Sequence, residues 1–159
     1  MNYTQVIIPR YDFQGRIRGK DQVTGKVYSK KDMKVRPDIQ QRLTVENDDK
    51  ENMYSTKELY EGIYKKCGVP IVFDFYHHKF CTGGLTEQEA LELALSTWPE
   101  GIVPLTHYSE SRRKEKLDES IKAQAHSDLI KGTIQTYGLD IDVVVEAKHK
   151  ELAVLNYKN

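Results

Sequence analysis

The sequence predicts an α/β fold with a parallel sheet of the (β/α) TIM-barrel type. Two observations lead to this prediction. The chain alternates short β-rich segments with longer segments of helical periodicity, and the β-rich segments end at residues able to bind a metal. The four β-rich segments are RLTVE (42–46), PIVFDF (70–75), IVPLTH (102–107) and IDVVVE (141–146). Metal-binding residues at successive strand ends are typical of the carboxyl rim of a barrel, where active sites are built.

The number of strands predicts an incomplete barrel. A closed eight-stranded barrel typically takes about 250 residues, whereas this chain has 159 residues and four clear βα units, or five with a contribution from its front end. A parallel sheet left open exposes unpaired backbone groups and apolar surface. We therefore expect the chain to pair with a separate front half of the barrel or with a second copy of itself.

Two capping boxes mark where the first two helices begin. Ser55 precedes Glu58 by three residues and Gly68 ends the segment, while Thr86 stands in the same relation to Glu89. The second helix is expected to stop before a Pro99/Gly101 break. Helical periodicity predicts two more helices, one over Leu117–Tyr137 closed by Gly138 and one in KHKELAVLNY (148–157).

Composition excludes several classes of protein. Hydrophobic residues make up 38% and charged residues 30% of the chain, without an apolar run of membrane-spanning length. The start MNYTQVIIPR lacks the pattern of a secretory signal. Cys67 and Cys81 do not form a CxxC pair, so a disulfide framework or a thiolate zinc site is not expected. These features predict a protein of the cytoplasm or the nucleoid, with reduced thiols.

The charge is zero overall but unevenly distributed. Residues 1–36 hold nine Lys/Arg against three Asp/Glu, which leaves 15 against 21 in residues 37–159. The basic segment also contains tyrosines and glycines, a composition suited to a phosphate backbone and stacked bases. A solvated loop or hairpin, with TQVIIP paired to GKVYSK, is the simpler interpretation.

Four strand ends carry side chains that could share a cation. Glu46, Asp74 with His77 just beyond, His107 and Glu146 follow apolar residues and are separated by about one βα unit each. Taken singly, each histidine is better explained as a structural residue and each glutamate as a solvated one. Together they place carboxylates at the margin of a core without an obvious lysine or arginine partner in the same segments, and a divalent cation would neutralise them.

Several motifs resemble the UV damage endonuclease family. They are RLTVENDDKENMYS, VPIVFDFYHHKF, LTEQEALELALSTWPEGI, THYSES, AHSDLI and VVVEAKHKELAVL. The resemblance runs from Pro37 onward and corresponds to the C-terminal part of the family's barrel. It implies a metal-dependent (β/α)-barrel enzyme of DNA excision repair, related in fold to apurinic endonuclease IV and the xylose isomerases. Such enzymes nick double-stranded DNA 5′ to ultraviolet photoproducts.

The resemblance also implies the residues of the site. Two or three divalent ions, usually Mn²⁺, would be held by Glu46, Asp74, His77, His107, His126 and Glu146, of which Glu46, Asp74, His107 and Glu146 are the catalytic set. His126 follows only from the resemblance, because its own context reads as a helix surface. The oxygen and nitrogen donors favour Mn²⁺, Fe²⁺ or Mg²⁺ and are compatible with Zn²⁺. His78 is expected to support the fold, His149 to be solvated and Lys148 to contact phosphate.

Departures from the family pattern leave alternatives open. Leu105 occupies the position of a lysine that in some members is modified to bridge metals, and the family's front half is not recognisable in residues 1–36. We therefore divide the chain into an atypical basic segment, 1–36, and part of an endonuclease domain, 37–159. A catalytically silent remnant is the alternative function, and a sugar-isomerase-like enzyme a distant one. The residues with which the chain could meet DNA are Tyr11, Phe13, Arg16, Arg18, Tyr76, Tyr108 and the run Arg112–Lys114.

Overall fold

The structure is a computed structural model that describes residues 10–11, 17–20, 27–28 and 42–157. The chain divides into two units, Met1–Leu43 and Thr44–Asn159. In the first unit, the short strands β1 (Arg10–Tyr11), β2 (Ile17–Lys20) and β3 (Val27–Tyr28) form an antiparallel sheet in the order β1-β2-β3. The segment TQVIIP lies outside the described residues, and β3 of the GKVYSK segment pairs with β2.

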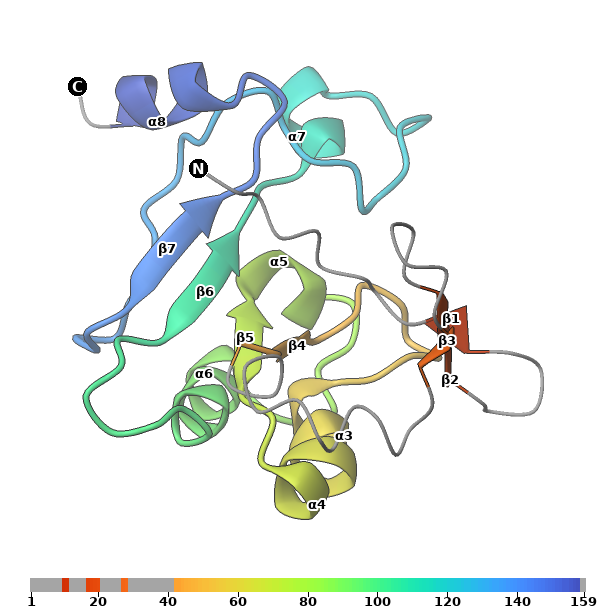
Figure 1. Cartoon of the computed structure of the whole chain (residues 1–159). Helices are drawn as coiled ribbons and strands as arrows, with labels where there is room; N and C mark the ends of the chain where they lie inside the picture. The colour runs from red at the N-terminus through yellow and green to blue at the C-terminus, as the bar shows by residue number, and fades with distance from the viewer. Residues whose placement is uncertain (1–9, 12–16, 21–26, 29–41, 158–159) are drawn as a thin grey trace. The chain divides into compact units, whose positions relative to one another are not determined.

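A four-stranded parallel sheet forms the frame of the second unit (Figure 1). Its strands lie in the order of the sequence, and each of the four predicted β-rich segments overlaps one of them, although β6 continues one residue beyond its segment. They are β4 (Val45–Glu46), β5 (Ile71–Asp74), β6 (Leu105–Tyr108) and β7 (Asp142–Val145). The α/β class and the parallel sheet are thus confirmed. The barrel form stays a prediction, because the four strands that the structure describes in this unit make up a single open sheet.

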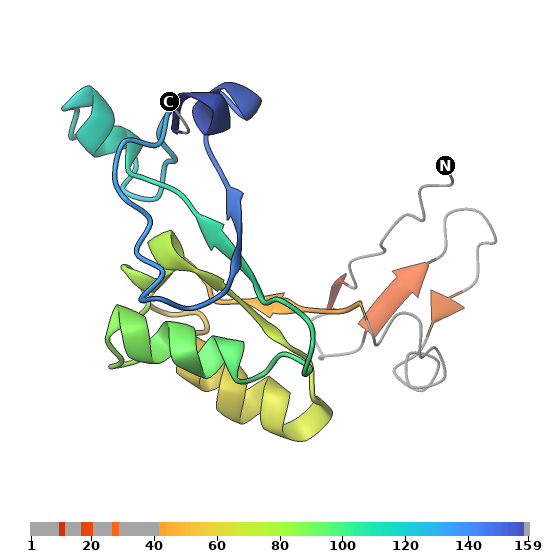
Figure 2. The ribbon, with the colours of Figure 1, turned by 90° about the vertical axis from the view of Figure 1, so that its left-hand side faces the viewer.

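The two helices with capping boxes begin where the sequence predicts. The first runs through α3 (Thr56–Leu59), the π-helical turn η1 (Tyr60–Tyr64) and α4 (Lys65–Cys67). Ser55 caps its start, and Gly68 ends it at φ 66°, a left-handed conformation in which glycine has no Cβ strain. The second, α6 (Glu87–Leu95), starts from the Thr86 capping box. Both helical segments pack on the same face of the sheet (Figure 2).

Strand β5 lies at the centre of the hydrophobic core. All four of its residues are buried, and Phe73 contacts Phe75 edge to face with ring centroids 4.9 Å apart. The start of the strand is fixed by the Ile71 peptide, whose N–H donates to the Thr97 hydroxyl and whose carbonyl accepts from the Trp98 indole. Each large apolar side chain buried here contributes roughly 1.5–3 kcal/mol. The carboxyl end of β5 is therefore held rigidly.

The predicted helix over Leu117–Tyr137 is wrong. A shorter helix, α7 (Arg112–Lys116), precedes it with Leu117 as its C-cap, and residues 117–137 are turns, bends and irregular chain apart from an isolated antiparallel β-bridge between His126 and Ser111. One local and one tertiary contact oppose a helix there. The Asp118 carboxylate accepts hydrogen bonds from both the backbone N–H and the hydroxyl of Ser120, and Ile130 is drawn into the core. Tertiary burial and side-chain turns thus override helical periodicity.

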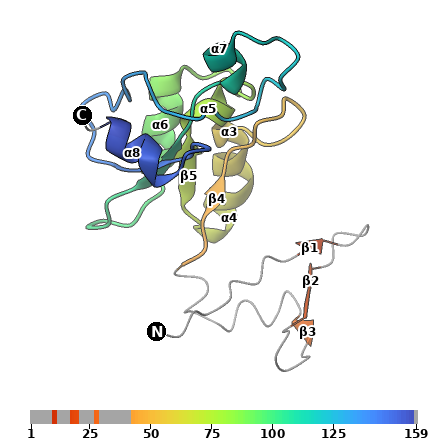
Figure 3. The ribbon, with the colours of Figure 1, turned by 90° about the horizontal axis from the view of Figure 1, so that it is seen from above.

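The remaining short helices lie at the carboxyl end of the sheet. Helix α5 (Phe75–His78) follows β5 directly, and α8 (Glu151–Tyr157) confirms the predicted last helix. Figure 1 shows α7 and α8 beyond the carboxyl ends of β6 and β7, and Figure 3 looks onto this end of the unit. In the ranges that the structure describes, no helix is long and apolar enough to cross a membrane.

Candidate metal centre

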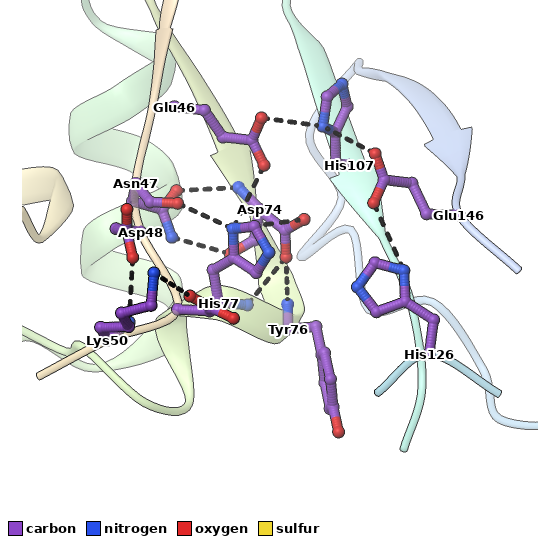
Figure 4. Close-up of polar contacts among 11 residues, drawn as sticks. Glu46, Asn47, Asp48, Lys50, Asp74, Tyr76, His77, His107, His126 and Glu146 are labelled. Carbon is purple, nitrogen blue, oxygen red and sulfur yellow. Dashed lines mark hydrogen bonds and ion pairs between the residues drawn. The ribbon is translucent and has the colours of Figure 1, made fainter. Parts of the chain in front are cut away.

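The carboxyl edge of the sheet gathers all six predicted donor residues (Figure 4). Glu46 and Asp74 are the last residues of β4 and β5, and Glu146 follows β7 directly. His107 stands opposite Asp74 in the β5–β6 register, which puts both side chains at the same level of the sheet. Parallel strands end at the same edge, so side chains far apart in the sequence meet there.

Asp74 brings His77 to this edge through the geometry of α5. As the N-cap of that helix, its Oδ1 accepts hydrogen bonds from the backbone N–H groups of Tyr76 (2.6 Å) and His77 (2.8 Å). The tight turn points the His77 ring back at the strand end, with Nδ1 3.8 Å from Asp74 Oδ2 and 3.2 Å from Glu46 Oε1. The three-residue spacing of Asp74 and His77 is thus the spacing of a helix cap.

Asn47 orders the same part of the site, although sequence reasoning did not single it out. Its side-chain amide donates to the Asp74 carbonyl (3.0 Å) and its Oδ1 accepts from the Asp74 N–H (2.8 Å), which continues the β4–β5 pairing beyond the end of β4. Its own carbonyl oxygen lies 2.9 Å from His77 Nδ1. The side chain is only 1% exposed. The sequence signal for it is an asparagine directly after the strand-end residue Glu46.

The donors form one continuous chain of contacts. Glu46 lies between His77 and His107, with one carboxylate oxygen 3.2 Å from each ring nitrogen Nδ1. Glu146 in turn lies between two imidazoles, with Oε1 3.5 Å from His107 Nδ1 and Oε2 3.5 Å from His126 Nδ1. Each glutamate therefore offers its two oxygens to different histidines.

Burial and mutual contact set the protonation of these groups. Burial raises the pKa of Asp74 to about 6. Burial would also raise the pKa of Glu46, but its contacts with His107 and His77 prevail and lower it to about 2. For His77, desolvation opposes protonation, yet Glu46 and Asp74 raise its pKa to about 9. Contact with Glu46 also raises the pKa of His107. The raised pKa values favour the protonated imidazole at His77 and at His107, on either side of the Glu46 carboxylate.

The residues of the site fit a divalent cation. One ligand atom from each of Glu46, Asp74 and His77 lies within 4.8 Å of the others. Among the described residues, Asp74 Oδ2 is one of the buried side-chain atoms without a hydrogen-bond partner. A buried carboxylate oxygen in that condition is costly, and a cation between the donors would remove the cost. The set contains carboxylate and imidazole donors and no thiolate, the pattern of Mn²⁺, Fe²⁺ or Mg²⁺ sites, with Zn²⁺ also compatible.

Residues near the cluster differ in their surroundings. His78 is 4% exposed and tilts against the Phe73 ring, outside the chain of donors. Burial lowers the pKa of His78. His149 and Lys148 are exposed, and Leu105 is half-buried on β6 without a group that could bridge ions.

Several of the residues proposed to meet DNA make contacts within the protein. The Tyr76 hydroxyl donates to the Ala123 carbonyl, and the Tyr108 hydroxyl donates to Glu110. Arg112 pairs with Asp128, and Arg113 pairs with Glu119. Lys114 is exposed. Tyr11, Arg18 and the other proposed residues of the first unit either have no described side chain or lie outside the described residues.

A parallel α/β sheet with carboxylates and imidazoles at its carboxyl edge is typical of metal-dependent enzymes. The family model for the UV-endonuclease UvdE matches residues 8–159, and the chain belongs to that family. The motifs that resemble the family begin at Pro37, whereas the family model already matches from residue 8.

Relatives and a solved structure agree with this membership. The chain is 32% identical over 130 residues to a UV DNA damage endonuclease of Bacillus cereus, covering 75% of this chain and 38% of the relative. It is 32% identical over 127 residues to one of Nostoc sp., covering 76% and 36%. The crystal structure of SacUVDE matches with a TM-score of 0.61 and 26% identity over 77% of this chain and 40% of that one. The chain thus spans well under half the length of these proteins.

Proposed function

We propose that this chain provides the metal-binding part of an endonuclease that cuts double-stranded DNA 5′ to ultraviolet lesions in excision repair. One observation carries the proposal. In a member of the UV-endonuclease family, six carboxylate and imidazole side chains form a continuous chain at one sheet edge, and a buried oxygen of Asp74 lacks a hydrogen-bond partner. The proposed ligands are Glu46, Asp74, His77, His107, His126 and Glu146.

The arrangement of the glutamates favours more than one ion. Glu46 and Glu146 each turn one oxygen toward one histidine and the other oxygen toward another, so each carboxylate can serve two neighbouring positions. Two or three Mn²⁺ ions would accordingly share the six residues. When bound, divalent cations supply Lewis-acid stabilisation of the negative charge of a phosphodiester undergoing hydrolysis.

The protein's own residues hold and orient this centre. Asn47 fixes the Asp74 peptide, and Asp74 fixes the start of α5 and hence His77. Burial of Asp74 keeps water from its carboxylate and leaves Oδ2 available to a cation. Lys148, two residues after Glu146, is exposed and in this proposal contacts a phosphate of the DNA. We assign these roles to a domain of residues 37–159, apart from a basic segment of residues 1–36, in a protein acting on the nucleoid.

Nicking of irradiated DNA tests the proposal. The purified chain is incubated with Mn²⁺ and an end-labelled duplex, irradiated or not, and the position of any cut is read on a sequencing gel. We expect cutting 5′ to lesions in the irradiated duplex, loss of cutting in Glu146→Gln, and unchanged cutting in the control His149→Gln, whose exposed imidazole lies outside the donor chain. Cutting of both duplexes alike, or cutting by Glu146→Gln, contradicts the proposal.

Metal binding is measured separately, because the chain spans only 38% of the first relative's length. Calorimetric titration with Mn²⁺ reports binding without requiring catalysis. Mn²⁺ binding without DNA cutting would support the metal centre. It would overturn the proposal that this chain is an active endonuclease and favour a catalytically silent remnant.

A further inference from the structure

His126 reaches the metal centre on a segment outside the helices and strands, where it forms an isolated antiparallel β-bridge with Ser111. On one side of this segment, the Arg112 N–H donates to the Ala125 carbonyl (2.8 Å) and the Ser127 N–H donates to the Glu110 carbonyl (2.8 Å). On its other side, the Lys148 N–H donates to the Ser127 carbonyl (2.9 Å). The segment 125–129 therefore lies between the chain that follows β6 and the chain that follows β7.

The Glu115 side chain fixes the far end of the same segment. Its Oε2 accepts a hydrogen bond from the Asp128 N–H (2.8 Å) and its Oε1 accepts one from the Leu129 N–H (3.2 Å). The side chain is only 9% exposed, although α7 lies at the surface. Burial would raise the pKa of Glu115, but the two N–H donors lower it, so the group is a carboxylate at neutral pH. Hydrogen bonds to an ionised acceptor are roughly twice as strong as neutral ones.

Other contacts between α7 and the segment are more exposed. Lys116 and Arg112 both pair with the Asp128 carboxylate, at 2.5 Å and 3.3 Å, but their own side chains are 42% and 36% exposed. Ion pairs in contact with water contribute little, because solvent screens them and the long side chains lose entropy. The Glu115 carboxylate instead holds the backbone itself, within three residues of His126.

We propose that Glu115 is a positioning residue, whose carboxylate holds the segment 125–129 so that His126 meets Glu146 at the metal centre. Glu115 touches neither donor and acts through the peptide N–H groups that follow His126. The inference rests on the proposed function, since it takes His126 and Glu146 as ligands. It implies two parts of the centre, because the hydrogen bonds and ion pair described for Glu115 reach Asp128, Leu129 and Lys116 rather than the group formed by Glu46, Asp74 and His77.

Calorimetric Mn²⁺ titration of the full chain separates the two parts of the centre. The Mn²⁺ sites that are lost in His126→Asn are taken as the His126-dependent class. We expect Glu115→Gln to weaken that class about 10- to 100-fold, as changes to residues that orient ligands typically do, and to leave the remaining class unchanged. The control Glu119→Gln removes the same charge from an 89% exposed side chain that pairs with Arg113, and it should bind as wild type does.

A double-mutant cycle tests whether Glu115 acts through His126. In the His126→Asn background, Glu115→Gln should cause no further loss of affinity. A further loss, an equal weakening of both classes, or wild-type affinity in a folded Glu115→Gln protein would each overturn the inference. If circular dichroism shows that Glu115→Gln is unfolded, Glu115→Asp, which keeps the charge but shortens the reach, carries the same expectation.

Imidazole NMR of the metal-free protein gives a readout independent of metal. Glu115→Gln should shift the ring resonances of His126 and leave those of His77 and His107 in place. If the wild-type chain binds no Mn²⁺, the proposed function fails, and this measurement still decides the inference. An unchanged His126 ring in Glu115→Gln would then overturn it.

Discussion

Replacing Asn47 by alanine tests how the site is held together. The change removes two hydrogen bonds to the Asp74 peptide, at 2.8 Å and 3.0 Å, in a place where the Asn47 side chain is 1% exposed. It leaves one buried N–H and one buried carbonyl without their partner. Each such group costs about 1–3 kcal/mol, so we expect the free energy of unfolding to fall by about 2–4 kcal/mol, allowing for partial rehydration.

Urea unfolding followed by circular dichroism measures this loss. Gln88→Ala is the matched control, because it removes an amide whose hydrogen bond to Glu92 is exposed, and it should cost less than about 0.5 kcal/mol. Mn²⁺ affinity should also fall in Asn47→Ala, by about 10-fold or more, since residues that orient ligands have effects of this size. A folded Asn47→Ala protein with the stability and Mn²⁺ affinity of wild type would refute this account of β4 and β5.

Three further outcomes follow from the same contacts. Ser55→Ala removes the capping box with Glu58 and should lower the free energy of unfolding by about 1 kcal/mol in urea; an unchanged midpoint would contradict it. The pKa of His77 is raised to about 9. Its protonated imidazole therefore adds to the free energy of unfolding of the metal-free protein in full below about pH 6.5, and this contribution is lost as pH rises through 9. His77→Gln should therefore flatten the fall in stability between those pH values, and a parallel fall would be inconsistent with the ion pair to Glu46. Mn²⁺ must displace protons from His77 and His107, whose pKa values are both raised, so binding should tighten from pH 6 to 9 and release protons in calorimetry; affinity that falls over this range would count against these ligands.

Elements with strong local signals could be predicted from the sequence. The strand around Ile71 is a short apolar run, and the helices that start after Ser55 and Thr86 are defined by capping residues three positions apart. These signals depend on neighbouring residues alone. The grouping of the strand-end side chains could also be predicted, because parallel strands share a carboxyl edge once the strands are recognised.

Features that depend on distant contacts could not be predicted in this way. The segment after Leu117 has helical periodicity, but burial of Ile130 and pairing of Ser127 with distant backbone decide its conformation. The role of Asn47 requires knowing that it faces Asp74, 27 residues away. Glu115 likewise acts on Asp128, 13 residues further along the chain. Residues that support the proposed ligands are therefore harder to recognise from the sequence than the proposed ligands are.

Anomalous diffraction from crystals grown with Mn²⁺ tests the central claim most directly. The account predicts peaks at the carboxyl edge of the sheet, within about 2.0–2.6 Å of donor atoms, the range of cation–oxygen bonds. At least one peak should lie among Glu46, Asp74 and His77, whose ligand atoms are within 4.8 Å of one another. Peaks found only elsewhere on the protein, with these side chains still paired to one another, would contradict it.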